Sequence, residues 1–207
     1  MRPEAGQLLR SFDKNSLQRK IRRAASEGLT YEEGRSEALL DKFYHLLLLT
    51  RRRHQPPPQP RDWSRTLMAC LGEFLKIRVA STDGQPMASI ITVRYKHTLV
   101  YKYGCSDPRF HNLGGTALLF WKTIQEAKRD GQQEFDLGRS DSDNRGIVKF
   151  KDHWGTTRST LTYLRYPARP LHTTGERYGM QLARRVLARV PDWILRLTGQ
   201  LLYKHIG

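Results

Sequence analysis

The stretch TLVYKYGCSDPRFHNLGGTALLFWKTIQEAKRDGQQEFDL, residues 98–137, holds the change of pattern that decides the fold. Its first part, Thr98–Gly104, is rich in β-branched and aromatic residues, which is typical of a strand. The pair Gly114-Gly115 then opens a predicted helix over Thr116–Asp130. The apolar segment Glu134–Leu137 follows as a short strand that we expect to be buried. The stretch therefore predicts a strand, a crossing helix and a second strand.

Two more strands are predicted immediately upstream, over Phe74–Ser81 and Met87–Tyr95. The residues between them, Thr82-Asp83-Gly84, are a hairpin signal. Together with Thr98–Gly104 they predict an antiparallel meander of three strands. The outer elements complete the order β-α-α-β-β-β-α-β-α-β, and they are predicted as a helix over 15–27, a strand over 29–33, a helix capped by Ser36, a helix over 62–71, a helix over 145–153 and a last strand over 159–166. A mixed order with a hairpin-rich middle indicates an α+β fold.

Composition and charge narrow the classes of function. The chain has 207 residues and a formal net charge of +16, which favours an anionic partner such as nucleic acid, a phospholipid surface or a phosphorylated substrate. An ordinary basic surface that only keeps the protein soluble is the alternative. The two cysteines, Cys70 and Cys105, are far apart and suit a reducing compartment. The sequence shows no signal peptide, no membrane span and no metal-ligand spacing, so we expect a cytoplasmic protein without a metal.

The composition changes after Pro170. Two amphipathic basic helices are predicted over Glu176–Arg189 and Asp192–Lys204, separated at Val190-Pro191. We therefore divide the chain into an N-terminal basic helix (1–28), a central domain (29–170) and a C-terminal pair of basic helices (171–207). The apolar stripe of the last pair can either cover the core, as most amphipathic helices do, or lie on an anionic membrane surface.

The first candidate site is the loop from Tyr103 to Gly115, YGCSDPRFHNLGG. Backbone N–H groups at a glycine-rich helix start can hold a pyrophosphate or a carboxylate, and the helix dipole adds positive charge there. Arg109, His111 and Asn112 in the same loop favour anion binding. The alternative is a turn with no ligand.

The second candidate is Phe135–Gly155, FDLGRSDSDNRGIVKFKDHWG. Asp136 ends the predicted strand and, if buried, needs a partner such as Arg139. Lys151 stands between Phe150 and Trp154, and a lysine beside aromatic rings can be partly desolvated and stabilise an oxyanion or phosphate. A structural ion pair at Asp136 and a solvated helix lysine at 151 are the alternatives.

The ordered set Tyr-Gly-x-Ser-Asp, NLGGTALLFWKTIQEAKRDG, Phe-Asp-Leu-Gly and Phe-Lys-x-x-Trp-Gly resembles the Fem-type transferases of the GNAT fold, which build peptidoglycan cross-bridges. It is more similar still to their relatives associated with exopolysaccharide export. The resemblance runs from about Ser16 to Tyr166. It implies a mixed central sheet with a splayed pair between the fourth and fifth strands, and flanking helices. Two features depart from the family: only one GNAT-like half is present, and the pyrophosphate signature of common acetyltransferases is matched loosely.

The resemblance implies that Lys151 stabilises charge during acyl transfer, in the motif Phe150-Lys151-Asp152-His153-Trp154-Gly155. We add Asp136 as base or orienting group and Tyr103 as a group that positions or protonates the leaving group, so the predicted catalytic residues are Lys151, Asp136 and Tyr103. The predicted donor-binding residues are Arg109, His111, Asn112, Gly114, Gly115 and Thr116. The predicted substrate-binding residues are Tyr101, Ser106, Asp107, Arg139, Asn144, Phe150 and Trp154.

The leading hypothesis is direct acyl or aminoacyl transfer from acyl-coenzyme A or aminoacyl-tRNA to a cell-envelope saccharide or peptidoglycan precursor. No nucleophile stands out, which disfavours a covalent intermediate. The alternative is a non-catalytic GNAT-like module that binds nucleic acid or an anionic membrane through its basic surface. An open donor pocket beside Lys151 favours the enzyme, and a filled turn at Gly114-Gly115 favours the module. Contacts with tRNA, with a membrane or with a second copy of the chain stay open.

Overall fold

A computed structural model describes residues 5–54, 57–164, 166 and 190–203. The chain divides into two units, one formed by residues 1–50 and 61–156 and the other by residues 51–60 and 157–207.

The first unit is built on a five-stranded sheet whose strands follow one another in sequence order, β1-β2-β3-β4-β5. The strands are β1 (Thr30–Gly34), β2 (Leu75–Thr82), β3 (Gln85–Tyr95), β4 (Thr98–Ser106) and β5 (Glu134–Asp136). Neighbours pair antiparallel except β4 and β5, which are parallel. Asp83 and Gly84 in the β2–β3 turn both have positive φ, as a two-residue hairpin turn requires. The predicted α+β class is thus confirmed.

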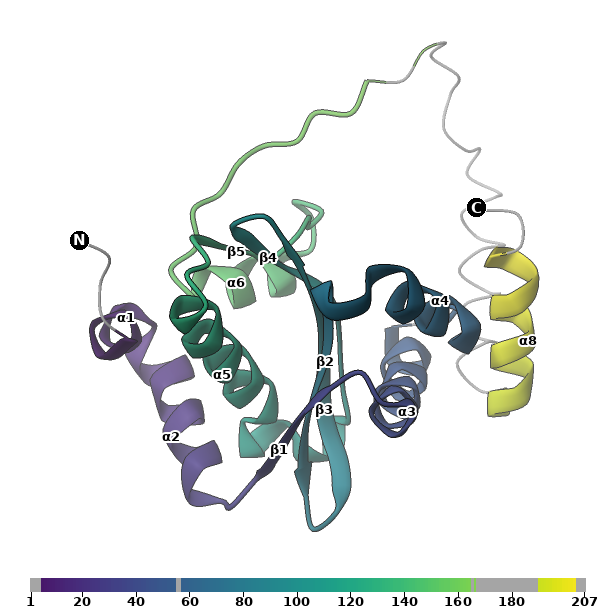
Figure 1. The fold of residues 1–207 in the computed structure, drawn as a ribbon, viewed down its shortest axis with the longest axis horizontal. Helices are drawn as coiled ribbons and strands as arrows, with labels where there is room; N and C mark the ends of the chain where they lie inside the picture. The colour runs from purple at the N-terminus through teal and green to yellow at the C-terminus, as the bar shows by residue number, and fades with distance from the viewer. Residues whose placement is uncertain (1–4, 55–56, 165, 167–189, 204–207) are drawn as a thin grey trace. The chain divides into compact units, whose positions relative to one another are not determined.

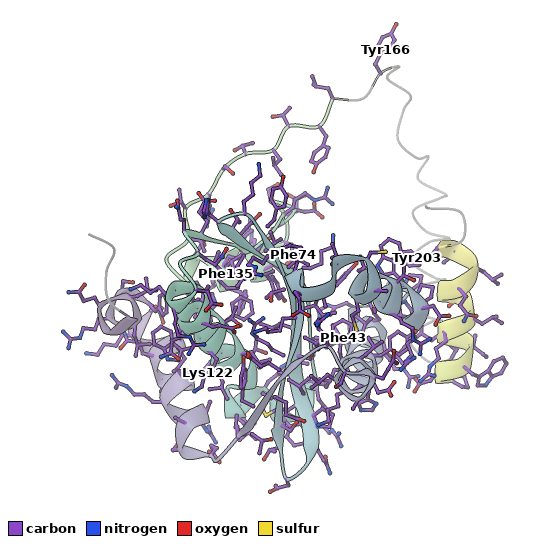
Figure 2. All side chains as sticks on the ribbon, viewed as in Figure 1. Phe43, Phe74, Lys122, Phe135, Tyr166 and Tyr203 are labelled. Atoms are coloured by element: carbon purple, nitrogen blue, oxygen red, sulfur yellow. The ribbon has the colours of Figure 1, made fainter. Side chains whose placement is uncertain are left out.

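Helices cover both faces of this sheet (Figure 1). Helices α3 (Glu37–His54) and α4 (Arg61–Leu71) lie on one face, and α2 (Arg19–Ser26), α5 (Gly115–Arg129) and α6 (Arg145–Asp152) belong to the other. Figure 2 shows Phe43 of α3 and Phe135 of β5 on opposite sides of the sheet. Phe43 contacts Tyr103 of β4, with ring centroids 6.4 Å apart, whereas Phe135 contacts Phe120 of α5 at 5.7 Å. We call these two sides the α3 face and the α5 face.

The N-terminal segment belongs to the α5 face. It consists of α1 (Ala5–Ser11), a π-helical turn (Lys14–Gln18) and α2. Asp13 begins this turn by accepting a hydrogen bond from the Ser16 N–H (2.6 Å), two residues before the start of the helix predicted over 15–27. Phe12 and Ile21 are buried in the core, while the cations of α2 point to solvent. The segment is therefore amphipathic and contributes apolar side chains to the core.

The parallel pair at the end of the sheet is splayed, as the resemblance implied. Only Thr98, Leu99 and Val100 of β4 pair with β5, and β4 then continues to Ser106 without it. The last predicted strand, over 159–166, is wrong: residues 159–164 are described and have no regular structure. Leu161 and Tyr163 there are 62% and 71% exposed, so the β-like composition has no neighbouring strand to pair with in the described residues.

The second unit contains α8 (Asp192–Tyr203), which corresponds to the helix predicted over 192–204. The other predicted C-terminal helix, over 176–189, lies outside the described residues. None of the described helices is long and apolar enough to cross a membrane.

Candidate active site

The candidate site lies where β4 and β5 separate. The chain leaves β5 at Asp136 in a tight turn. The Asp136 carboxylate accepts a hydrogen bond from the Gly138 N–H (2.7 Å). Gly138 has φ +71, and a Cβ there would contact the Tyr101 carbonyl oxygen at 3.5 Å, so the turn passes directly beside β4. Asp136 is exposed and bonds to the main chain. Asp136 is thus not buried, and the main chain of the turn satisfies its carboxylate locally.

Lys151 reaches the same turn from α6. Asn144, which was predicted to bind substrate, caps this helix by accepting a hydrogen bond from the Ile147 N–H (3.3 Å). The Lys151 ammonium donates to the Gly138 carbonyl oxygen. Burial lowers the pKa of Lys151, and the negative charge of Asp136 partly offsets this effect. Lys151 and Asp136 thus meet at one turn beside the opening of the sheet.

The two aromatic residues of the lysine motif pack into the core. Trp154 is buried and stacks on Phe120, with centroids 5.2 Å apart, and Phe150 meets the edge of the same ring at 5.4 Å. Phe12 of the N-terminal segment contacts Trp154 at 5.1 Å, and the Asp13 N–H bonds to the His153 carbonyl (3.2 Å). Phe150 and Trp154, predicted to contact substrate, therefore fix the position of α6 and through it of Lys151.

A β-bulge separates the two predicted tyrosines. Ile91 of β3 pairs with Tyr103 and Thr92 pairs with Tyr101, so Lys102 is an extra residue in β4. Tyr101 consequently lies on the α5 face, 4.9 Å from the Phe120 ring, with its hydroxyl over Gly104. Tyr103 lies on the α3 face, where its hydroxyl accepts a hydrogen bond from Trp63 Nε1 (3.2 Å). Of the two, only Tyr101 is on the side of Lys151, and burial raises its pKa.

The loop after β4 is held by its own side chains. Asp107 is buried, and its Oδ1 accepts a hydrogen bond from the Arg109 backbone N–H (2.9 Å). Its Oδ2 accepts hydrogen bonds from Nε and Nη2 of the Arg109 guanidinium (2.9 and 2.7 Å). Hydrogen bonds from Arg109 lower the pKa of Asp107. Ser106 Oγ lies 2.9 Å from His111 Nε2. Asp107, Arg109, Ser106 and His111 thus shape this loop from within.

The predicted donor turn is packed against protein. Gly114 has φ +79, and a Cβ on it would lie 2.5 Å from the Lys20 carbonyl oxygen of α2. A Cβ on Gly115 would lie 2.9 Å from the Met87 side chain. Both glycines are buried, Thr116 is half-buried and Asn112 is exposed. The two glycines therefore allow close approach of α2 and β3, and the structure does not show an open cradle at their Cα atoms.

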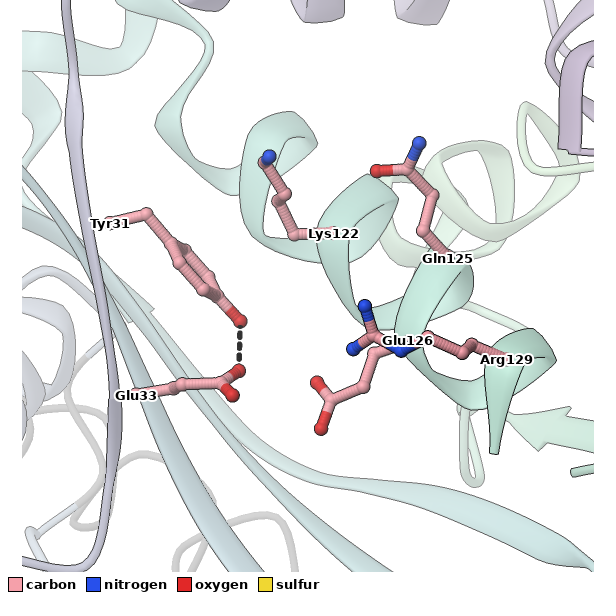
Figure 3. Close-up of a pocket in the computed structure, with 6 residues that line it drawn as sticks. All are labelled: Tyr31, Glu33, Lys122, Gln125, Glu126 and Arg129. Carbon is pink, nitrogen blue, oxygen red and sulfur yellow. Dashed lines mark hydrogen bonds between the residues drawn. The ribbon is translucent and has the colours of Figure 1, made fainter. Parts of the chain in front are cut away.

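A cleft of about 370 Å³ lies between β1 and α5, away from the Lys151 turn, and was missed by the sequence reasoning (Figure 3). Its lining residues are Tyr31, Glu33, Lys122, Gln125, Glu126 and Arg129. Tyr31 donates to Glu33 (2.5 Å), and its pKa is raised by burial and by this bond. Beneath it, Arg78 is 2% exposed and binds Glu126 (2.5 Å), which also accepts from Lys76. One sequence pattern could have predicted this network. Lys76 and Arg78 are two residues apart in a predicted strand, so both cations point to the same face of the sheet.

Burial alone would raise the pKa of Glu126, but the hydrogen bonds from Arg78 and Lys76 outweigh it and lower that pKa. Glu33 also accepts a hydrogen bond from Lys76 (3.2 Å), so both carboxylates of the cleft are neutralised by cations of β2. Among the described residues, no three His, Cys, Asp or Glu side chains are grouped so that they could hold a metal ion.

Comparison with solved structures agrees with this geometry. FemX aligns with 75% of this chain at a TM-score of 0.68 and 14% identity. The match covers 56% of FemX, so this chain spans little more than half of its length. The aminoglycoside 6'-N-acetyltransferase AAC(6')-Ih from Acinetobacter baumannii aligns with 69% of this chain and 100% of its own, at a TM-score of 0.54 and 18% identity. AAC(6')-Iy, in complex with a coenzyme A bisubstrate analogue, aligns with 68% of this chain and 99% of its own, at a TM-score of 0.54 and 14% identity.

No curated protein matches the sequence. The model of the acetyltransferase (GNAT) domain family matches residues 11–151, which is more than half of the chain. This range begins at the N-terminal segment and ends at Lys151, so it contains the whole splayed sheet. The chain therefore belongs to the acetyltransferase (GNAT) domain family and is a transferase of the acyltransferase class.

Proposed function

We propose that this protein transfers an acyl or aminoacyl group directly to an amine or hydroxyl of a cell-envelope saccharide or peptidoglycan precursor. The observation that carries the proposal is the meeting of Lys151 and Asp136 at the turn where the pairing of β5 with β4 ends. The choice of acceptor rests on the Fem-type resemblance of the Phe-Asp-Leu-Gly and Phe-Lys-x-x-Trp-Gly motifs. The structural likeness to FemX, at 14% identity, supports the fold alone.

The chemistry needs few groups. The acceptor nitrogen or oxygen attacks the donor carbonyl, the new bond to the acyl carbon forms, and the bond to the thiol or to the tRNA ribose oxygen breaks. Lys151 has three N–H donors and gives one to Gly138, so the others can stabilise the oxyanion. The exposed Asp136 carboxylate is the proposed acceptor of the proton that the attacking group loses. Tyr101, on the same face, is the better placed of the two tyrosines to contact substrate.

Acyl-coenzyme A is the donor that we favour over aminoacyl-tRNA. A neighbour of similar fold, AAC(6')-Iy, was solved with a coenzyme A bisubstrate analogue. The packed Gly114-Gly115 turn implies that the donor's phosphates contact the exposed side of this loop, where Asn112 and the Arg109 side chain lie. In this chain Thr116 remains half-buried at the start of α5 and can contribute its hydroxyl.

The packed turn also favours the second candidate, a GNAT-like module that binds an anionic partner without catalysis. The two can be separated by thermal shift with acetyl-coenzyme A, because a bound ligand stabilises the folded state by mass action. A concentration-dependent rise in melting temperature supports the transferase. No shift with acetyl-coenzyme A or with aminoacyl-tRNA supports the module.

The role of Lys151 is tested by Lys151→Ala with Lys149→Ala as the matched control. Both variants remove one cation from α6, but Lys149 is exposed and makes no contact with the Gly138 turn in the described residues. Thiol release from acetyl-coenzyme A with amino-sugar acceptors should fall on the order of 100-fold or more in Lys151→Ala, while the thermal shift with acetyl-coenzyme A is kept. Lys149→Ala should change turnover little. Equal losses in the two variants would mean a general electrostatic effect and would remove Lys151 from the mechanism.

A further inference from the structure

Helix α8 in the second unit has one buried side, called the filled side below, and one solvent-exposed side, called the bare side. On the filled side Leu195 is 2% exposed and Gly199 is buried. A Cβ on Gly199 would lie 2.2 Å from the Pro58 carbonyl oxygen, so the helix lies directly on the segment 57–60. Only glycine permits so close an approach of two backbones. This side of α8 is therefore already occupied by the same unit.

The bare side is a stripe of large apolar side chains. Trp193, Leu197 and Leu201 are 66%, 46% and 58% exposed, and their spacing of four places them on one side of the helix. Leu202 beside them is 48% exposed. A run of exposed apolar residues along one helix marks a surface that associates with something other than water.

The charges around the stripe indicate which kind of partner. The only acidic residue of α8 is Asp192, and it is paired with Arg52 of the same unit. Arg53 and Arg196 are exposed, and the whole chain carries a net charge of +16. An apolar stripe on a helix that carries Arg196, and whose own carboxylate is paired, fits an anionic lipid surface, since cations contact the headgroups and apolar side chains enter the acyl boundary.

The length of α8 fixes how it can meet a bilayer. Its 12 residues extend over about 18 Å, which is too short to cross a hydrocarbon core of about 30 Å. A helix of this length with a bare apolar side and a covered side lies flat in the interface. We propose that α8 is a peripheral membrane-docking surface, in which Trp193, Leu197 and Leu201 enter an anionic lipid interface. This inference does not depend on the proposed acyl transfer.

The test is co-sedimentation of the full chain with vesicles of phosphatidylglycerol and phosphatidylcholine. The full chain should bind these vesicles, bind pure phosphatidylcholine much less, and be released by salt. Leu197→Glu with Leu201→Glu should weaken the binding about tenfold or more, because two carboxylates replace the inserted side chains. The matched control is Leu161→Glu with Leu164→Glu, which changes the same residue types and the same net charge at positions that are 62% and 94% exposed.

The outcomes decide between lipid and other occupants. Loss of binding in the α8 variant alone supports docking through the stripe. Equal loss in both double variants would mean attraction by overall charge and would overturn the proposal. A fall of the melting temperature confined to the α8 variant would show that the stripe packs on the protein. A change from dimer to monomer in light scattering would show that it joins two copies. Either of these results, without vesicle binding by the full chain, also rejects lipid docking.

Discussion

The two faces of the sheet are stabilised by different means. The α3 face is mainly aliphatic. The buried residues of α3 are Leu39, Leu40, Phe43, Tyr44, Leu46, Leu47 and Leu48. Leu75, Ile77 and Val79 of β2 are also buried, and they alternate with Lys76 and Arg78, which bond to Glu126 on the α5 face. Its ion pairs lie at the surface, where Glu37 binds Arg61 and Arg65. The α5 face is aromatic and charged, with the Phe120 cluster near α6 and the buried Arg78–Glu126 pair under α5. The aliphatic face adds stability, whereas the α5 face also orients the lysine of the candidate site.

The largest expected effect is at the buried ion pair. Arg78→Met leaves the Glu126 carboxylate, which is 11% exposed, with Lys76 as its remaining partner. We expect a loss of about 3 kcal/mol in the free energy of unfolding, because removal of one buried partner leaves the Glu126 charge only partly compensated. Adding Glu126→Leu should recover most of this loss in urea unfolding. If the loss of unfolding free energy in the double variant equals the sum of the losses in the two single variants, the two charges do not act as a pair.

A smaller effect should distinguish the faces by function. Phe43→Leu and Phe120→Leu each remove a fully buried ring and should each cost about 1–2 kcal/mol. Only Phe120→Leu loosens Phe150 and Trp154 on α6, so only this variant should expose Lys151 to water. Because burial lowers the pKa of Lys151, its pKa should then rise toward the ordinary value. Lysine side-chain NMR titration measures this directly, and an equal rise in Phe43→Leu would refute the difference between the faces.

The smallest effect should appear at the surface of the α3 face. Hydrogen bonds from Arg65 and Arg61 lower the pKa of Glu37 from 4.5 to about 2. A lowered carboxylate pKa adds stability above pH 4.5, and this contribution is lost as the pH falls from 4.5 toward 2. Glu37→Gln should therefore reduce the acid dependence of the unfolding free energy between pH 5 and about pH 3. Asp143→Asn, at an exposed loop carboxylate, is the control and should keep the wild-type slope.

Local patterns predicted most of the elements but little of what lies between them. The hairpin signal at Asp83-Gly84 and the alternation in β2 and β3 are properties of a few neighbouring residues, so they are visible in the sequence. The packing of Lys20 on Gly114 brings together residues that are far apart in the chain, so no local sequence pattern predicts it. The same holds for Phe12 on Trp154. Lys151 could be selected as a candidate because its motif is local, whereas the packing roles of Phe150 and Trp154 depend on Phe120.

The extra residue at Lys102 has a consequence for how β4 can change in evolution or by design. Because side chains alternate along a strand, the bulge reverses the inside and outside of every position after it. Tyr101 and Tyr103 pair with the consecutive residues Thr92 and Ile91, so deletion of Lys102 would leave the two tyrosines on opposite sides. If Lys102 were instead drawn into the pairing, the two tyrosines would share one side and Cys105 would leave its buried place beside Phe43. Elsewhere in β4, insertions or deletions of two residues preserve the facing of every side chain, whereas a single one exchanges the α3-facing and α5-facing positions on one side of the change.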